Sequence, residues 1–339
     1  MMKIQLSLCI PTYNRAKFLT ETIESILTQF NDEVELIISD NASEDNTTEI
    51  VQRYQQLHPR ITYHRWDKNM GADANFLKVV ELSRGKFCWF IGSDDTVTPG
   101  AIEKVISYLK RRDNASGLSV NSLSCSYDMS FKQNVVFGMP QITNQPFMND
   151  KWYEHGSEAF YHLADYFGYI SAQIVNRRLW NEVIVTCNVA EYFQAHVHVY
   201  VISEMLIRYG NWGYIHYPCI NYRSGNDSFL ERGNFYRLSI LVKGYEKIIS
   251  NVWWEFPFVQ RSVSNLILRI HVMNLIGGVY LKTPLSVKIE PWYFFRSFLL
   301  CFSFYWEKPF FWIQIAPFCM IPRPIIFLIK KVKRVITKL

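Results

Sequence analysis

The sequence predicts an α/β fold in which a mostly parallel sheet is flanked by helices, followed by a mainly helical, aromatic-rich C-terminal extension. Three observations predict it. Short apolar runs alternate with amphipathic helical patterns over the first 110 residues. This alternation stops near residue 235, where longer helical patterns with broad apolar faces begin. Residues 291–329 then hold a high density of Trp, Tyr and Phe.

The first 110 residues alternate regularly between strand and helix patterns. Apolar runs of strand length cover residues 5–10, 34–39, 61–66 and 87–91, and helical patterns follow each of them. Strands that alternate with helices pair in parallel, and the helices cover both faces of the sheet. Ligands bind such sheets at the carboxyl ends of the strands. We therefore expect the functional site in the loops that follow these strands.

Polar residues follow each of the four predicted strands. The clusters are Thr12, Tyr13 and Arg15; Asp40 and Asn41; Asn69, Asp73 and Asn75; and Asp94 and Asp95. Two adjacent carboxylates at the end of a buried strand are costly unless they bind a cation. Oxygen ligands suit Mg²⁺ or Mn²⁺ bridging to a diphosphate. The absence of G-x-G-x-x-G after the first strand disfavours a dinucleotide site, and the absence of G-x-x-x-x-G-K-[ST] excludes a P-loop.

Four ordered motifs in this region resemble those of the family 2 glycosyltransferases of the GT-A fold. They are SLCIPTYNR, SDNASEDNT, NMGADANF and GSDD, spread over roughly residues 5–110. The form G-x-D-x-N-F and a later R-x-G-N-D-S-F are similar to the abequosyltransferase branch of O-antigen biosynthesis enzymes. The resemblance implies an enzyme that uses a nucleotide-sugar donor together with Mn²⁺ or Mg²⁺.

The resemblance also implies roles for individual residues. The donor-binding residues of the first loop would be Pro11, Thr12, Tyr13 and Arg15. Asp40 and Asn41 would contact the nucleobase, Asp73 and Asn75 would lie beside the nucleotide, and Asp94 would reach the ribose or sugar. Asp95 would hold the metal on the donor diphosphate, which makes it a catalytic residue as well. Because Asp95 lies in a loop, we expect Asp95→Ala to remove metal-dependent donor binding while leaving the fold intact.

The sequence differs from the family pattern at the position expected for the general base. Many inverting members carry a Glu-Asp pair at the head of the next helix, and residues 188–198 contain no such pair. His196 sits where abequosyltransferase-like sequences also place a histidine, and imidazole has a suitable pKa for a base. Glu191 is the alternative carboxylate. A hydrogen-bonded structural histidine at a helix start explains His196 equally well.

A polar loop at residues 223–229 follows a further predicted strand at 215–222. An arginine before a glycine-containing turn rich in hydrogen-bond donors suits a phosphate, so Arg223 and Ser228 are candidate donor-binding residues. They would contact the donor diphosphate or the phosphate of a lipid-linked acceptor. The alternative is an ordinary Gly-Asn-Asp turn.

Composition and charge limit the partners and the compartment. Seven scattered cysteines without C-x-x-C support neither a disulfide framework nor a zinc site, and reduced thiols fit the cytoplasm. The net charge is +6, and the last ten residues hold five cations and no acid. The rest of the chain is therefore close to neutral, which argues against a nucleic-acid-binding face.

The aromatic segment at 291–329 predicts contact with a membrane surface. Its longest uncharged stretch, 309–322, has 14 residues, whereas a spanning helix needs about 20. Aromatic residues followed by a basic tail fit a segment that lies in the headgroup region of an anionic leaflet. The alternative is that the aromatic side chains pack onto the catalytic domain as a helical cap.

We expect a catalytic domain at 1–234, with a donor half at 1–110 and an acceptor half at 111–234, and a membrane-associating region at 235–339. The enzyme would lie on the cytoplasmic face of the inner membrane. It would move a sugar, such as the deoxyhexose abequose, to an undecaprenyl-diphosphate-linked saccharide in O-antigen or other surface polysaccharide biosynthesis. One alternative is a nucleotidyltransferase, which normally needs a glycine-rich basic first loop. Another is a non-catalytic glycan- or membrane-binding protein with a retired transferase domain, which the intact Asp94-Asp95 pair opposes.

Overall fold

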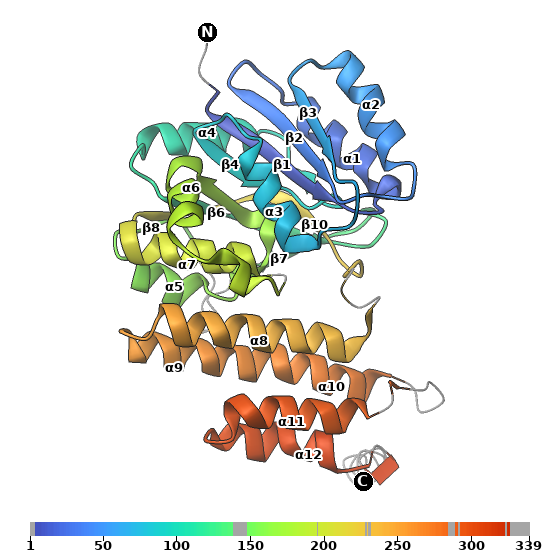
Figure 1. The fold of residues 1–339 in the computed structure, drawn as a ribbon, viewed down its shortest axis with the longest axis vertical. Coiled ribbons are helices and arrows are strands. Elements are labelled where there is room, and N and C mark those ends of the chain that lie inside the picture. The colour runs from blue at the N-terminus through green and yellow to red at the C-terminus, as the bar shows by residue number, and fades with distance from the viewer. Residues whose placement is uncertain are drawn as a thin grey trace.

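The computed structural model describes residues 4–137, 148–194, 196–227, 229, 232–283, 289–290, 292–322 and 324–325. Within them, a ten-stranded sheet flanked by helices forms the N-terminal body, and pairs of helices stack beneath it (Figure 1). Ser228 and the five tail cations between residues 330 and 338 lie outside the described residues.

The sheet is mixed, and its first half is parallel as predicted. Its strand order is β3-β2-β1-β4-β9-β6-β10-β5. The parallel half consists of β1 (Leu6–Thr12), β2 (Val34–Asp40), β3 (Ile61–Arg65) and β4 (Phe87–Phe90). The second half contains β5 (Thr96–Val97), β6 (Gly117–Cys125), β9 (Gln173–Asn176) and β10 (Trp212–Arg223), and β7 (Lys132–Phe137) and β8 (Lys151–Tyr153) pair with β6 and β10. Here β9 runs antiparallel to both neighbours and β10 runs parallel to β6.

Seven helices of the body are α1 (Ala16–Leu27), α2 (Thr47–Leu57), α3 (Ala72–Glu81), α4 (Ala101–Arg111), α5 (Gly156–Leu163), α6 (Arg177–Thr186) and α7 (Val197–Tyr209). Short 3₁₀ turns lie at Tyr166–Gly168, Ile170–Ala172 and Val189–Tyr192. Helix α1 buries one apolar face, which carries Phe18, Leu19, Ile23 and Ile26. Burial of such faces against the sheet stabilises these short helices.

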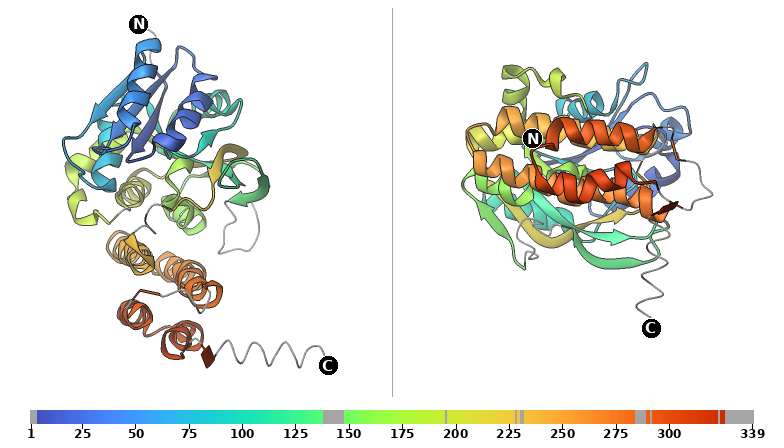
Figure 2. Two further views of the ribbon diagram at one scale, coloured as in Figure 1. Left: turned by 90° about the vertical axis from the view of Figure 1, so that its right-hand side faces the viewer. Right: turned by 90° about the horizontal axis from the view of Figure 1, so that it is seen from below.

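The C-terminal region is helical, as predicted, and forms two layers. The first contains α8 (Asn234–Val252) and a continuous helix made of α9 (Pro257–Leu266), a π-helical segment (Ile267–Val272) and α10 (Met273–Lys282). The second, which we call the distal layer, contains α11 (Tyr293–Tyr305), a π-helical segment (Phe311–Ile315) and α12 (Ala316–Met320). Figure 2 shows the first layer between the sheet and the distal layer.

One helix among the described residues, Pro257–Leu281, is long and apolar enough to cross a membrane. In the structure, 44% of its most apolar window is buried, as in the core helix of a folded domain. It contacts α8 and α5 on the side of the body and α12 in the distal layer. The sequence analysis predicted that a different segment, 309–322, is too short to span a membrane.

Candidate active site

Asp94 and Asp95 follow β4, and the structure gives the two carboxylates different surroundings. Asp95 is 3% exposed; its Oδ2 accepts hydrogen bonds from the hydroxyls of Tyr169 (2.8 Å) and Ser171 (2.6 Å), and its Oδ1 accepts one from the backbone N–H of Arg223 (2.9 Å). Asp94 is half-buried, and its Oδ2 accepts a hydrogen bond from the Asn226 amide (2.5 Å). Asp94 is therefore the more accessible carboxylate of the pair.

The burial of Asp95 corrects the expected outcome of Asp95→Ala. Alanine would leave the hydroxyls of Tyr169 and Ser171 and the N–H of Arg223 without their acceptor in a buried place. Each unsatisfied buried group costs about 1–3 kcal/mol. We therefore expect this variant to lose stability as well as metal-dependent donor binding, and Asp94 is the better position for a clean test.

The two carboxylates are electrostatically coupled. Burial, together with the adjacent charge of Asp94, raises the pKa of Asp95 to about 7. Burial also raises the pKa of Asp94, whereas the hydrogen bond from Asn226 and the charge of Arg15 lower it. The Arg15 guanidinium therefore lies close enough to act on Asp94. A bound cation would favour the ionised form of both carboxylates.

Gly92 shows that the two carboxylates turn toward one small space. A Cβ atom at Gly92 would lie 2.9 Å from Oγ of Ser171, 3.1 Å from Oδ2 of Asp95 and 3.2 Å from Oδ1 of Asp94. Three oxygen atoms thus border a volume that only glycine leaves open. Oγ of Ser171 is already engaged, because it accepts from the N–H of Gly92 (2.8 Å) and donates to Asp95. The two carboxylates remain as the oxygen ligands that Mg²⁺ or Mn²⁺ prefers.

No group of three or more His, Cys, Asp or Glu side chains suited to a metal occurs among the described residues. The protein would therefore supply one or two carboxylates and leave the other positions to water and substrate. That division is usual for Mg²⁺ bound with a phosphate substrate.

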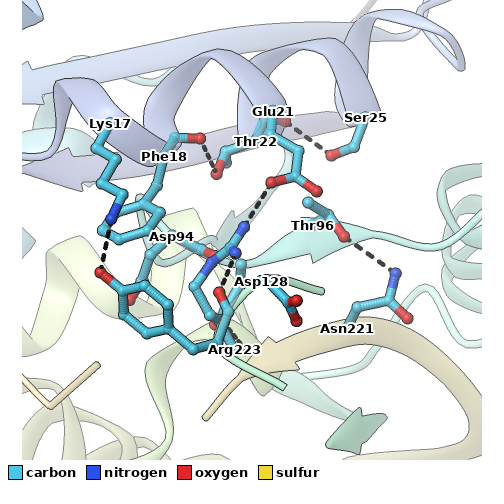
Figure 3. Close-up of polar contacts among 12 residues, drawn as sticks. Lys17, Phe18, Glu21, Thr22, Ser25, Asp94, Thr96, Asp128, Asn221 and Arg223 are labelled. Carbon is cyan, nitrogen blue, oxygen red and sulfur yellow. Dashed lines mark hydrogen bonds and ion pairs between the residues drawn. The ribbon is translucent and has the colours of Figure 1, made fainter. Parts of the chain in front are cut away.

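Arg223 differs from the sequence expectation of a phosphate ligand. It is 4% exposed, and its Nε donates to the carbonyl of Asp94 (2.8 Å), its Nη1 to the carbonyl of Tyr127 (2.6 Å) and its Nη2 to the carboxylate of Glu21 (2.5 Å). The guanidinium also lies over the ring of Phe18, 4.8 Å from its centroid. Figure 3 shows Arg223 enclosed between α1 and the Asp94 loop. All three guanidinium nitrogens are thus engaged inside the protein.

The loop after β10 joins the Asp94 carboxylate to the C-terminal helices. Asn226 donates to Asp94, and the next residue, Asp227, pairs with Arg237 in the first turns of α8 (2.7 Å). Sequence reasoning placed Asn226 in a donor-rich turn but did not assign it to Asp94. The G-N-D triplet was the available signal, because Asn and Asp in turns readily offer hydrogen bonds.

The residues predicted for the base of the nucleotide lie at the carboxyl edge of the sheet, as expected from their strands. Asp40 is fully buried; its Oδ1 accepts from the N–H of Ser43 (2.9 Å), and its Oδ2 accepts from the hydroxyl of Tyr63 (2.8 Å) and faces Arg65 (3.7 Å). Asn41 donates to Asn69 (2.8 Å). Both residues hold this edge together, and their contact with a nucleotide stays a prediction.

Asn75, which lies on α3, forms hydrogen bonds to the same edge of the sheet. Its amide donates to the carbonyls of Thr12 (3.3 Å) and Ser39 (2.9 Å) and accepts from the indole N–H of Trp66 (3.2 Å). Pro11 lies opposite Ser39 in the β1–β2 register.

The hydroxyls of Thr12 and Ser39 are buried without hydrogen-bond partners in the described part of the chain, whereas Tyr13 is exposed. Buried polar groups are normally paired. These hydroxyls are therefore the unsatisfied groups beside the predicted nucleotide position.

Asp73 connects this edge to the helix that carries a candidate base. Its Oδ1 accepts from the backbone N–H of Val197 (2.9 Å), the first residue of α7. A carboxylate there satisfies a free N–H and complements the helix dipole. His196 precedes Val197, so Asp73 brings His196 toward the donor half.

The surroundings of His196 correct one sequence argument for it as a base. The side chain is buried, its Nδ1 lies 3.0 Å from the carbonyl of Gln194, and its ring packs against Gly244 and Tyr245. Burial lowers the pKa of His196 to about 4, well below the value expected of a free imidazole. The imidazole is therefore neutral at pH 7 but only weakly basic.

Glu191 lies farther from the Asp94 loop. It is exposed, accepts from Asn188 (2.7 Å) and lies 3.8 Å from Lys247 on α8. Lys247 is ten residues beyond Arg237, which pairs with the loop that holds Asp94, and ten residues of helix span about 15 Å. His196 packs at Gly244, three residues nearer to Arg237 along α8, so the structure brings His196 closer than Glu191 to the predicted donor edge.

The buried histidines predict a loss of stability in acid. Burial lowers the pKa of His198 to about 3 and that of His196 to about 4, whereas an unfolded histidine titrates near 6.5. Their contribution to stability is complete above pH 6.5 and is lost as the pH falls toward 4, by up to about 1.4 kcal/mol per pH unit for each histidine. In urea unfolding at pH 7, 6 and 5, we expect His198→Phe to reduce this slope. The exposed control His155→Phe should leave it unchanged, and an equal slope in both variants would contradict the assignment.

Comparison with known proteins identifies the N-terminal part of the chain. Residues 7–166 match the family model described as glycosyl transferase family 2. These residues belong to that family. The chain is 29% identical over 271 residues to the abequosyltransferase RfbV of Salmonella typhimurium, covering 78% of this chain and 80% of that protein. It is 32% identical over 103 residues to the GalNAc(5)-diNAcBac-PP-undecaprenol beta-1,3-glucosyltransferase of Campylobacter jejuni, covering 30% of this chain and 33% of that protein.

Two solved structures share the fold. The S. aureus TarS 1–349 complex with UDP-GlcNAc has a TM-score of 0.62 at 14% identity and covers 89% of this chain and 82% of that one. The mannosyltransferase PcManGT from Pyrobaculum calidifontis, in complex with GDP-Man and Mn²⁺, has a TM-score of 0.54 at 13% identity and covers 94% and 86%. The glycosyltransferase family 2 domain therefore has the predicted GT-A-type architecture. The predicted helical C-terminal region of the chain is also confirmed.

Proposed function

We propose that this family 2 glycosyltransferase moves a sugar from a nucleotide-sugar donor to a lipid-linked saccharide during surface polysaccharide assembly. The observation that carries the proposal is the Asp94–Asp95 pair, because Oδ1 of Asp94 and Oδ2 of Asp95 both border the space beside Gly92 at the carboxyl edge of the sheet. A catalytic role explains why a glycine and two carboxylates occupy this loop, whereas a retired domain does not need them.

A divalent cation, Mn²⁺ or Mg²⁺, fits this place with Asp94 and Asp95 as its protein ligands. When bound, such an ion stabilises the charge that develops on the departing nucleoside diphosphate. The positive charge of Arg15 acts on Asp94 and lowers its pKa. Tyr169, Ser171 and the backbone of Arg223 hold Asp95 in place, so the pair is positioned before substrate binds. The Mn²⁺ in the complex of the archaeal mannosyltransferase supports this assignment.

For the general base we favour His196 over Glu191, because Asp73 joins the start of α7 to the donor half. A neutral imidazole can accept a proton from an acceptor hydroxyl, although a pKa of about 4 makes it a weak base. We expect His196→Gln to lower turnover and Glu191→Gln to have little effect. Equal turnover of His196→Gln and the unsubstituted enzyme would remove His196 from consideration.

The donor and the acceptor follow from the relatives. Similarity to an abequosyltransferase favours a deoxyhexose donor such as CDP-abequose. Similarity to a transferase whose name includes undecaprenol favours an undecaprenyl-diphosphate-linked saccharide as acceptor. The protein would then work peripherally on the cytoplasmic face of the inner membrane, with residues 1–234 as catalytic domain and 235–339 as membrane-associating region.

The released product tests this function. The purified chain would be incubated with CDP-, UDP-, GDP- and dTDP-sugars, Mn²⁺ and a bacterial lipid-linked saccharide fraction. We expect release of one nucleoside diphosphate, dependent on the acceptor. Release of pyrophosphate from nucleoside triphosphates would instead indicate a nucleotidyltransferase. If no nucleoside diphosphate forms although the lipid fraction binds, the protein is a non-catalytic glycan- or membrane-binding protein.

A further inference from the structure

We infer that the outer face of the distal layer is a docking surface for an anionic lipid bilayer. This inference deepens the proposed function by naming the residues that contact lipid, and it does not depend on the sugar that is transferred. Its evidence is the pattern of exposure on α11, the aromatic side chains of the neighbouring helix and the charge of the chain that follows.

Helix α11 is apolar on two faces, and only one of them is covered. Tyr293, Ser297, Cys301 and Tyr305, spaced by four residues, are buried against the rest of the protein. The exposed face carries a row that we call the outer stripe: Trp292, Phe295, Leu299, Phe302 and Trp306. Spacing of three or four residues places Phe295, Leu299, Phe302 and Trp306 on one side of the helix, and Trp292 directly precedes the helix with a φ of 61°. Trp292 is 76% exposed and Trp306 is 53% exposed, although both side chains are large and apolar.

The neighbouring helix extends the outer stripe into a wider surface. Trp312 lies with its ring centroid 6.0 Å from that of Phe302, and Ile313 and Met320 are exposed on the same layer. Monomeric soluble proteins rarely expose contiguous apolar patches of this kind. Trp is typical of the interface between lipid headgroups and acyl chains, where its ring is apolar and its N–H stays hydrated.

Charge decides between a bilayer and a second copy of the chain as the occupant. The described chain ends beside α12, and the sequence beyond it carries Lys330, Lys331, Lys333, Arg334 and Lys338 with no acid. Each cation near an anionic leaflet adds about 1 kcal/mol to binding. A second copy of the chain has the same five cations and no acid in that segment, so it offers the tail no complementary charge there. An anionic bilayer would therefore bury the aromatic surface and also attract the cations of the tail.

A chain of contacts connects this surface with the active site. Asn226 contacts Asp94, its neighbour Asp227 pairs with Arg237 on α8, and Arg296 of α11 lies over the ring of Phe235, 3.8 Å from its centroid. Packed helices lie 8–10 Å apart, so docking by the outer stripe would hold the Asp94 edge roughly 20 Å above the bilayer. That height suits an acceptor hydroxyl carried by a saccharide better than one at the lipid phosphate.

The first test measures vesicle binding by sedimentation without donor or acceptor. The full chain would be compared with the triple variant Phe295→Ser, Leu299→Ser and Phe302→Ser. The control is Leu57→Ser with Val185→Ser, which removes two exposed apolar side chains from the catalytic body. We expect at least tenfold weaker binding of the triple variant to vesicles of phosphatidylglycerol and phosphatidylcholine, and no change in the control. Equal binding of all three proteins would overturn the inference.

A second measurement does not depend on the folding of the triple variant. Brominated phosphatidylcholine in the same vesicles should quench part of the tryptophan fluorescence of the full chain. Changing Trp292, Trp306 and Trp312 to Tyr should remove this quenching. Quenching that persists in that variant, or a lipid-independent dimer in light scattering that the serine changes dissociate, would overturn the inference. Because neither experiment uses donor or acceptor, a failure here is distinct from a failure of the transferase assignment.

Discussion

Asp94→Asn is expected to lower turnover of the nucleotide sugar by about 10²–10³-fold, the effect seen when one electrostatic contact to a transition state is removed. The asparagine keeps the size of the side chain and can still accept the hydrogen bond from Asn226, so the loop should fold normally. The loss comes from the missing charge beside Asp95 and Arg15. Initial rates at saturating Mn²⁺ and thermal unfolding of the same preparations would be compared.

The matched control for this variant is Asp128→Asn. Asp128 is an exposed aspartate near the site in Figure 3, and its carboxylate accepts hydrogen bonds from the hydroxyls of Ser126 (2.6 Å) and Ser130 (2.7 Å). We expect it to keep full turnover. If Asp94→Asn and Asp128→Asn had similar rates, the active-site assignment of Asp94 would fail.

Arg223→Gln is expected to lower both the free energy of unfolding, by roughly 3 kcal/mol, and the turnover. Arg223 is buried, and its guanidinium joins the Asp94 backbone, the Tyr127 backbone and Glu21. Glutamine cannot reach the three acceptors, so two carbonyl groups lose a charge-assisted hydrogen bond. A shift of the Asp94 loop by about 1 Å would then cost turnover even at saturating donor.

Two further variants separate a positioning role from a phosphate-binding role of Arg223. Arg223→Lys keeps the charge near Glu21 but not the planar fork, so we expect it to recover part of the stability and little of the turnover. Glu21→Gln should cost under about 1 kcal/mol, because half of the Glu21 side chain is exposed. An Arg223→Gln protein with unchanged stability and kcat but a raised KM for the donor would show the phosphate ligand expected from the sequence.

The donor half of the fold could be predicted because local patterns determine it. Strands β1 to β4 are short apolar runs between helices, and parallel pairing follows from that order. The antiparallel insertion of β9 between β4 and β6 could not be read from sequence, because pairing between distant strands leaves no local periodicity. The two-residue strand β5 is too short to produce any pattern.

In the site, too, the positions of residues could be predicted from local patterns, whereas their burial and long-range contacts could not. The positions of Asp94, Asp95, Asp40 and Asn75 followed from strand ends, and the structure places all of them at the carboxyl edge. Their burial did not follow. Arg223 looked like a phosphate ligand because an arginine before a Gly-Asn-Asp turn usually faces solvent, and its partner Glu21 is about two hundred residues away on α1. Contacts over that distance depend on the assembled fold.

The C-terminal region shows what amino-acid composition can and cannot predict. Aromatic density and basic residues predicted a membrane surface, and the alternative predicted a cap on the catalytic body. The structure separates the two by residue: Tyr293 and Tyr305 are buried within the helical layers, whereas Trp292 and Trp306 face outward. Periodicity alone could not tell which face is covered, because α11 carries apolar side chains on two faces.

Nucleotide binding tests the central claim most directly. Thermal stabilisation of the full chain and of Asp94→Asn would be measured with CDP, UDP, GDP and dTDP, each with and without Mn²⁺. A ligand at about 100 times its Kd stabilises the protein by about 2.7 kcal/mol, which is readily seen in the melting temperature. We predict stabilisation by one nucleotide, only with Mn²⁺ and only in the protein that retains Asp94. Stabilisation by none of the four, or equal stabilisation of Asp94→Asn, would contradict a metal-dependent donor site at this edge of the sheet.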